Sequence, residues 1–141
     1  MFVYKTTVRF YEIDYARIAF FGRVFEYAHA ALEELLTSLF GHPGAIFEAH
    51  GFGMPLVHSE ADYKAPMRLG DRLRVEVTVS RLSERSATFR YAIVGDDDGR
   101  PRAQVTLVHA FVSMIDFKPT AVPALFREAL EGAGLVAMPL S

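Results

Sequence analysis

The chain has 141 residues and no cysteine, which predicts one domain without a disulfide framework or thiolate chemistry. About half of the residues are hydrophobic (51%), and a net charge of −2 argues against an extended nucleic-acid-binding surface. No apolar stretch reaches the length of a membrane span, and the N-terminus lacks the features of a signal peptide. We therefore expect a soluble, cytoplasmic protein.

The N-terminal part of the chain predicts one strand and one long helix. Residues 3–9 alternate loosely and suit a strand. A helix is expected over residues 21–40, because apolar residues recur there at helical spacing: Val24, Ala28, Ala31, Leu32, Leu35, Leu36 and Leu39. The Gly-His-Pro-Gly stretch at 41–44 predicts the end of this helix. An irregular link is expected from there to about residue 52.

The remainder of the chain predicts four strands and a closing helix. These elements are expected over residues 54–66, 72–81, 86–94 and 104–116 for the strands and 122–132 for the helix. The clearest strand places four hydrophobic residues on one face: Leu73, Val75, Val77 and Val79. Short turns between the strands favour antiparallel neighbours. The prediction is a single α+β domain over residues 1–141, with one long helix against an antiparallel sheet.

Three stretches of the chain follow one another in a specific order: VRFYEIDYARIAFFGRVFEYAHAALEEL, GMPLVHSEADYKAPMRLGDRLRVEV and LVHAFVSMID. In this order they resemble the 4-hydroxybenzoyl-CoA thioesterase family of the hotdog fold. The middle stretch also resembles the branch that hydrolyses 1,4-dihydroxy-2-naphthoyl-CoA. The resemblance implies a sheet wrapped around one long central helix, a homodimer or homotetramer, and active sites at the subunit interface. It also implies an acyl-CoA substrate, with neither a metal nor an organic cofactor.

Asp14 stands just before the predicted helix, at the position of the family's catalytic aspartate. Hydrolysis of a thioester needs a nucleophile or a base, and donors that stabilise the carbonyl oxygen as it becomes negative. The backbone amides around Phe21 and Gly22, in the first turn of the helix, are expected to be those donors. Asp14 then either attacks the carbonyl carbon or activates a water. The alternative is that Asp14 only caps a turn.

Three positions depart from the family pattern. Arg17 stands where the family usually has a glycine, three residues after the aspartate. Phe21 replaces a frequent tyrosine, but it keeps the backbone N–H that the oxyanion role requires. Gly22 and Arg23 stand where Asn or His is common. Arg17 is expected either to alter the loop or to reach an anionic group of the substrate.

Several polar residues are candidate substrate contacts. Lys64, Arg68 and Arg85 are expected to contact the phosphates of coenzyme A, with solvated surface cations as the alternative. His58 is a further candidate, since the resemblance implies that its strand borders the acyl pocket. None of the histidines shows a metal-ligand spacing.

Other residues have a simpler structural interpretation. Glu33 and Glu34 lie in the long helix, where a second hotdog class places its catalytic acid, but ordinary solvent or subunit contacts are favoured here. Four phenylalanines either line an acyl pocket or pack in the core: Phe20, Phe21, Phe47 and Phe52.

The leading function is hydrolysis of an acyl-CoA thioester with an aromatic or bulky acyl group. An acyl-CoA or acyl-carrier binding module without turnover is the main alternative. It is supported by Arg17, which stands in place of the family's glycine. A hotdog dehydratase ranks last, because no histidine precedes the central helix.

Overall fold

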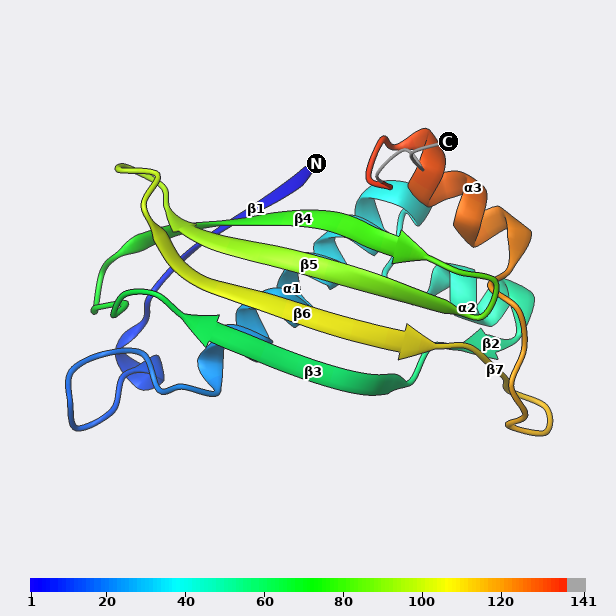
Figure 1. Ribbon diagram of the computed structural model, residues 1–141, viewed down its shortest axis with the longest axis horizontal. Helices are drawn as coiled ribbons and strands as arrows, with labels where there is room; N and C mark the ends of the chain where they lie inside the picture. Colours follow the sequence, from blue (N-terminus) through cyan, green and yellow to red (C-terminus); the bar gives the residue numbers. More distant parts are fainter. Residues whose placement is uncertain (137–141) are drawn as a thin grey trace.

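The structure, a computed structural model, describes residues 1–136 as an antiparallel sheet with three helices (Figure 1). The main sheet has the spatial order β1-β4-β5-β6-β3, formed by β1 (Phe2–Thr7), β3 (Leu56–Tyr63), β4 (Arg72–Leu82), β5 (Ser86–Gly95) and β6 (Pro101–Ala110). A two-stranded sheet pairs β2 (Phe52–Gly53) with β7 (Val112–Ser113). The helices are α1 (Arg23–Phe40), α2 (Ala45–His50) and α3 (Ala124–Gly132), and a short 3-10 turn precedes α1 at Phe10–Glu12.

The inner face of the main sheet forms the core together with α1. The predicted hydrophobic face of β4 is buried. Buried residues of the neighbouring strands lie opposite it: Val77 of β4 pairs with Tyr91 of β5, which pairs with Val105 of β6. Helix α1 contacts β1, β4 and β6. It turns its predicted apolar side inward, with buried residues at Val24, Tyr27, Ala28, Ala31, Leu32, Leu35 and Leu36. The period of each pattern therefore predicted which face is covered.

Two segments correct the expected element boundaries. The link expected to be irregular contains α2, which lies between Gly44 and a left-handed Gly51 (φ 63°) and buries Ile46. Six residues are too few to show helical periodicity, so the pattern could not reveal it. The strand expected over residues 104–116 is interrupted at Phe111, which is buried and packs against Phe52 and Phe126. The chain therefore leaves the main sheet after β6 and forms β7.

The sheet is accompanied by three helices and not by one central helix alone: α2 was not expected, whereas α3 lies within the closing helix predicted over residues 122–132. Helix α3 buries Phe126 and Leu130. An aromatic cluster joins these segments at one end of the sheet, formed by Phe40, Phe47, Phe52, Phe111 and Phe126. Within residues 1–136 no helix is both long and apolar enough to cross a membrane.

Strand β3 is an edge strand with little cover. It pairs with β6 on one side, and all of its residues except Ala61 are exposed. An edge of this length presents a row of backbone groups that can pair with another strand. Its last residue, Tyr63, lines a hollow beside the loop that precedes α1.

Candidate active site

A hollow of about 450 Å³ lies where the loop before α1 meets the segment after β3. In Figure 1 the end of β3 lies beside this blue loop. Two backbone contacts join the segments: Ala19 N donates to Met67 O at 2.7 Å, and Ile18 pairs with Arg68 in an isolated bridge. The hollow is lined by Asp14, Ile18, Ala19, Phe20, Phe21, Tyr63, Lys64, Ala65, Pro66 and Met67.

Asp14 occupies a tight turn at the rim of this hollow. Its Oδ1 accepts a hydrogen bond from Ala16 N at 2.8 Å, and its carbonyl accepts one from Arg17 N at 2.9 Å. Its backbone N–H donates to Ile18 O at 2.9 Å. This is the turn-capping geometry expected of an aspartate. Within residues 1–136 the second carboxylate oxygen has no hydrogen-bond partner, so it is free to act on a ligand.

Glu12 anchors the same loop, and the sequence pattern did not single it out. Its side chain is buried, and Oε1 accepts hydrogen bonds from Arg9 N at 2.7 Å and Tyr27 Oη at 3.1 Å. Burial, and then the nearby Glu12 carboxylate, raise the pKa of Tyr27 well above its ordinary value. Because Tyr27 belongs to α1, this contact fixes the loop of Asp14 against the helix.

The start of α1 presents free backbone donors. Gly22 is the N-cap residue, and no side chain caps the helix. In the described part of the chain, neither Phe21 N nor Gly22 N donates a hydrogen bond, whereas Arg23 N donates to Phe20 O at 2.8 Å. Free amides at a helix start carry a partial positive charge that favours an anionic ligand. Phe21 lines the hollow together with Asp14, whereas Gly22 is not part of the lining.

Tyr63 is a further residue that the sequence pattern did not identify. Its hydroxyl donates to Phe21 O at 2.5 Å, which joins the end of β3 to the start of α1. Partial burial raises its pKa above the ordinary value for tyrosine. The alternation along this strand predicted that Tyr63 shares a side with Ser59 and Ala61. These residues pair with buried residues of β6, so their side of the strand is the inner one, which faces α1.

The structure separates the other predicted substrate contacts. Lys64 lines the hollow, and Arg68 lines an adjoining one. Arg85 lies in the turn after β4, so the 11 residues of that strand separate it from Arg68, on the order of 30 Å. His58 pairs with Val108 on the outer face of the sheet, away from α1, and contacts Glu60 at 3.8 Å. The four residues therefore do not form one site within a single chain.

Arg17 adopts the left-handed backbone conformation, with φ at 68°. This explains why a glycine suits the position, because only glycine reaches that region without a steric cost. The side chain is exposed, and in the described chain it forms no hydrogen bond or ion pair. The turn after Asp14 therefore forms with an arginine in this conformation.

The phenylalanines divide between site and core. Phe20 and Phe21 are 45% and 66% exposed beside the hollow, with ring centroids 4.5 Å apart, whereas Phe52 is buried. Phe47 lines a separate apolar hollow of about 560 Å³ next to Met54. Glu33 and Glu34 of α1 are exposed, outside the lining of the hollow at Asp14. Among residues 1–136 no group of three His, Asp or Glu side chains is placed to hold a metal ion.

Comparison with known proteins identifies relatives over nearly the whole chain. Residues 8–130 match the thioesterase-like superfamily. A 1,4-dihydroxy-2-naphthoyl-CoA hydrolase from Synechocystis sp. is 26% identical over 129 residues, covering 92% of this chain and 94% of the relative.

Solved structures agree with this assignment. The crystal structure of a 1,4-dihydroxy-2-naphthoyl-CoA thioesterase from Synechocystis has a TM-score of 0.83 at 26% identity, covering 92% of this chain and 94% of that chain. A structure from the thioesterase superfamily of Jannaschia sp. CCS1 has a TM-score of 0.85 at 25% identity, covering 97% and 94%. The family predicted from the sequence is confirmed: the chain belongs to the thioesterase-like superfamily and is a thioester hydrolase of the hotdog fold.

Proposed function

We propose that the protein hydrolyses an acyl-CoA thioester to the free acid and CoA, with Asp14 as nucleophile or general base. One observation carries this proposal: Asp14, which has a free carboxylate oxygen, and Phe21, which has an unused backbone amide, line the same hollow. An anionic group beside an oxyanion donor is the arrangement that acyl transfer requires.

In the proposed reaction the thioester carbonyl oxygen lies against the amides of Phe21 and Gly22. In the nucleophilic route, Asp14 attacks the carbonyl carbon and the C–S bond breaks, so that CoA leaves as a thiolate and takes up a proton. Water then hydrolyses the acyl–aspartyl anhydride and regenerates the carboxylate. In the general-base route, Asp14 removes a proton from the water that attacks directly. Both routes use the same donors at the start of α1.

An aromatic acyl group is the proposed substrate class. The exposed rings of Phe20 and Phe21 border the hollow and offer apolar surface for such a group. The Synechocystis relative is named for the aromatic substrate 1,4-dihydroxy-2-naphthoyl-CoA, which supports this choice.

A homodimer formed through β3 is part of the proposal. Two copies of β3 paired antiparallel about a two-fold axis would place the Leu56 end of one strand beside the Tyr63 end of the other. The apolar hollow next to Met54 of one subunit would then approach the Asp14 hollow of its partner. Each complete site would contain parts of both subunits.

A binding module without turnover is the second candidate. It is favoured by the exposure of Asp14 and by the use of its Oδ1 in a turn, since both features also suit a purely structural aspartate.

Replacement of Asp14 by Asn tests the catalytic role. The Asn side-chain oxygen still accepts the bond from Ala16 N, so folding should be preserved, while the nucleophilic carboxylate is lost. We expect kcat for thiol release from benzoyl-CoA to fall by at least about 100-fold, with a smaller change in KM. The control is Asp97→Asn, an exposed carboxylate that does not line the hollow.

Two outcomes would contradict the proposal. Near-normal kcat with a lowered thermal midpoint in Asp14→Asn would leave Asp14 as a turn cap only. Binding of acyl-CoA by the unmodified protein, without thiol release from any of a panel of aromatic and aliphatic acyl-CoAs, would establish the binding module instead.

A further inference from the structure

A further hollow, of about 380 Å³, adjoins the candidate active site and is called here the second hollow. The two share Ala65 and Pro66, which form a ridge between them. Beyond the ridge, the second hollow is lined by Arg68, Asp71, Asp98, Arg100, Pro101 and Arg102. The carbonyl of Arg102 accepts hydrogen bonds from Lys64 N at 2.8 Å and from Ala65 N at 3.1 Å, so the ridge is fixed to the start of β6.

Both carboxylates of this hollow accept hydrogen bonds from arginines of its own lining. Asp71 Oδ2 accepts a hydrogen bond from Arg68 N at 2.8 Å. Asp98 accepts one from Arg100 N at 2.9 Å and another from Arg102 Nη2 at 3.0 Å. These two hydrogen bonds hold the pKa of Asp98 below its usual range, so it stays ionised and bound to its partners.

Two arginines of the hollow have side chains without a partner in the described chain. Within residues 1–136 the side chains of Arg68 and Arg100 form neither an ion pair nor a hydrogen bond, and both are exposed. Lys64, across the ridge, is likewise unpaired in the described chain. Three cations that form no ion pair in the described chain therefore surround the ridge, and the lining of the second hollow holds three arginines against two carboxylates.

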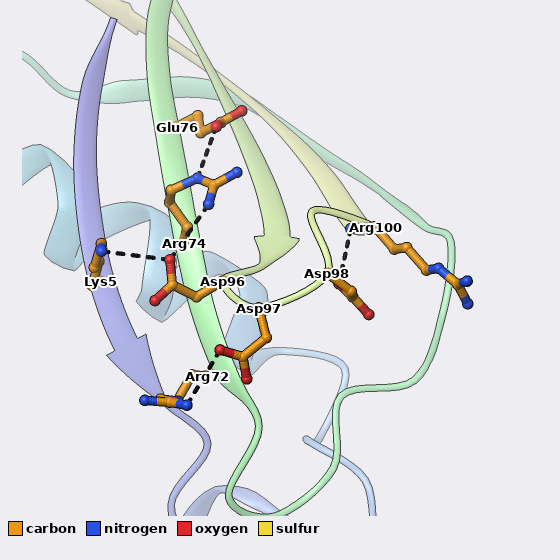
Figure 2. A network of polar contacts seen from close by, with 8 residues as sticks. All are labelled: Lys5, Arg72, Arg74, Glu76, Asp96, Asp97, Asp98 and Arg100. Atoms are coloured by element: carbon orange, nitrogen blue, oxygen red, sulfur yellow. Dashed lines mark hydrogen bonds and ion pairs between the residues drawn. The ribbon is translucent and has the colours of Figure 1, made fainter.

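The acidic side of the neighbouring turn does not neutralise Arg100. Figure 2 shows Asp96 and Asp97 directed toward β1 and β4, while Arg100 extends away from them. Both carboxylates have cationic partners within 3.6 Å, which are Lys5, Arg72 and Arg74.

We infer that this hollow binds the phosphate-bearing nucleotide end of coenzyme A, with Arg68 and Arg100 as its anion contacts. The inference rests on the proposed function, because the pantetheine arm would cross the ridge of Ala65 and Pro66 to bring the thioester to Asp14. A guanidinium can donate two parallel hydrogen bonds to a phosphate, which suits it to this role. Of these two arginines the sequence analysis indicated only Arg68, together with Lys64 and Arg85, because Arg100 comes near Arg68 only when β5 and β6 fold back.

The experiment compares the double variant Arg68→Ala/Arg100→Ala with a control that also loses two charges, Arg81→Ala/Arg90→Ala. Arg81 and Arg90 are exposed and line neither hollow. Binding of CoA, dephospho-CoA, 3′,5′-ADP, pantetheine and inorganic phosphate is measured by calorimetry. Turnover is measured with benzoyl-CoA and benzoyl-pantetheine.

For each arginine removed, we expect the Kd of CoA to rise roughly tenfold, and the Kd of 3′,5′-ADP to rise with it. The preference for benzoyl-CoA over benzoyl-pantetheine, as the ratio of their kcat/KM values, should fall by a similar factor. The control should keep the unmodified affinity for CoA. If the unmodified protein binds dephospho-CoA more weakly than CoA, the 3′-phosphate lies in the hollow. If it binds both equally, the pyrophosphate lies there. Both results support the inference.

The inference is overturned if CoA affinity is unchanged in the double variant, or if inorganic phosphate binds as tightly as CoA. It is also overturned if the control loses as much affinity as the double variant. These outcomes are independent of catalysis: a protein that binds CoA through these arginines but releases no thiol would refute the proposed function and leave the nucleotide site standing.

Discussion

The hydroxyl of Tyr63 donates a hydrogen bond of 2.5 Å to the carbonyl of Phe21, across 42 positions of sequence. The peptide bond between Phe21 and Gly22 is trans, so fixing the direction of this carbonyl also fixes the direction of Gly22 N–H. The end of β3 therefore orients one of the two amides proposed to stabilise the oxyanion. Tyr63 is a positioning residue in this arrangement.

Tyr63→Phe is predicted to lower kcat for thiol release by about tenfold, with a smaller change in KM. Loss of the hydroxyl frees the peptide plane without removing the ring, and small errors in donor placement are costly in the transition state. Steady-state kinetics on benzoyl-CoA and a thermal melt of the same sample measure the effect. Tyr11→Phe is the control, because in the described chain the Tyr11 hydroxyl has no hydrogen-bond partner. Equal kcat in Tyr63→Phe and the control would refute the positioning role.

Arg17→Gly is predicted to raise the free energy of unfolding by about 0.5–1 kcal/mol. The left-handed conformation at φ 68° costs an arginine more than the extra backbone entropy of glycine in the unfolded chain. Ala16→Gly, at a neighbouring residue without a positive φ, should lower stability instead. Urea unfolding of both variants measures the two effects.

The same Arg17→Gly variant decides between the two roles considered for this side chain. An arginine that only fits the loop leaves KM for acyl-CoA unchanged when it is replaced. A rise in KM of several-fold, together with increased stability, would show that Arg17 reaches an anionic group of the substrate.

Local patterns predicted the main elements because burial of one face imposes a period on the sequence. The period of two along β4 and the helical spacing from Val24 to Leu36 both agree with the observed burial. Helix α2 was missed because its six residues, fewer than two turns, are too few to show a helical period. The interruption at Phe111 was missed because a buried aromatic residue looks the same within a strand and at its end.

The site was predicted only where one short segment carries the signal. Asp14 and the first turn of α1 are close in sequence, and the structure places Asp14 and Phe21 in one hollow. The roles proposed for Tyr63 and Arg100 involve residues more than 30 positions away in sequence, Phe21 and Arg68, so they depend on strand register and on how β5 and β6 fold back. Arg68 and Arg85 stand at opposite ends of β4 in one chain, a separation that the residue types alone could not reveal.

His109 is predicted to make the folded state sensitive to acid. Its Nδ1–H donates to Met54 O at 2.8 Å, which leaves a lone pair on the buried Nε2, an atom without a partner in the described chain. Burial lowers the pKa of His109, and His29 lowers it further, while the Met54 carbonyl opposes the shift. The unfolded chain, with a histidine pKa near 6.5, therefore binds a proton more readily than the folded protein.

Stability should consequently be constant above about pH 7.5 and fall as the pH decreases through about 6.5, with a slope of at most about 1.4 kcal/mol per pH unit from this residue. His109→Gln should reduce the slope between about pH 6.5 and 5.5, whatever its effect on stability at pH 7.5. His50→Gln, at the exposed end of α2, is the control. An unchanged slope in His109→Gln would assign the acid sensitivity to other groups.

Val57→Lys is predicted to convert the proposed dimer into a folded monomer. Val57 is 61% exposed on the edge strand β3, and a lysine there opposes strand pairing between copies. Val3→Lys is the matched control, because Val3 lies on the other edge strand, β1, and is 38% exposed. Light scattering at tens of micromolar should give 15.8 kDa for Val57→Lys, and twice that mass for the control and the unmodified protein. Thiol release should fall with the dimer if each site needs both subunits. A mass of 15.8 kDa for the unmodified protein would refute the dimer, and full activity of a monomeric Val57→Lys would show that one chain carries the complete site.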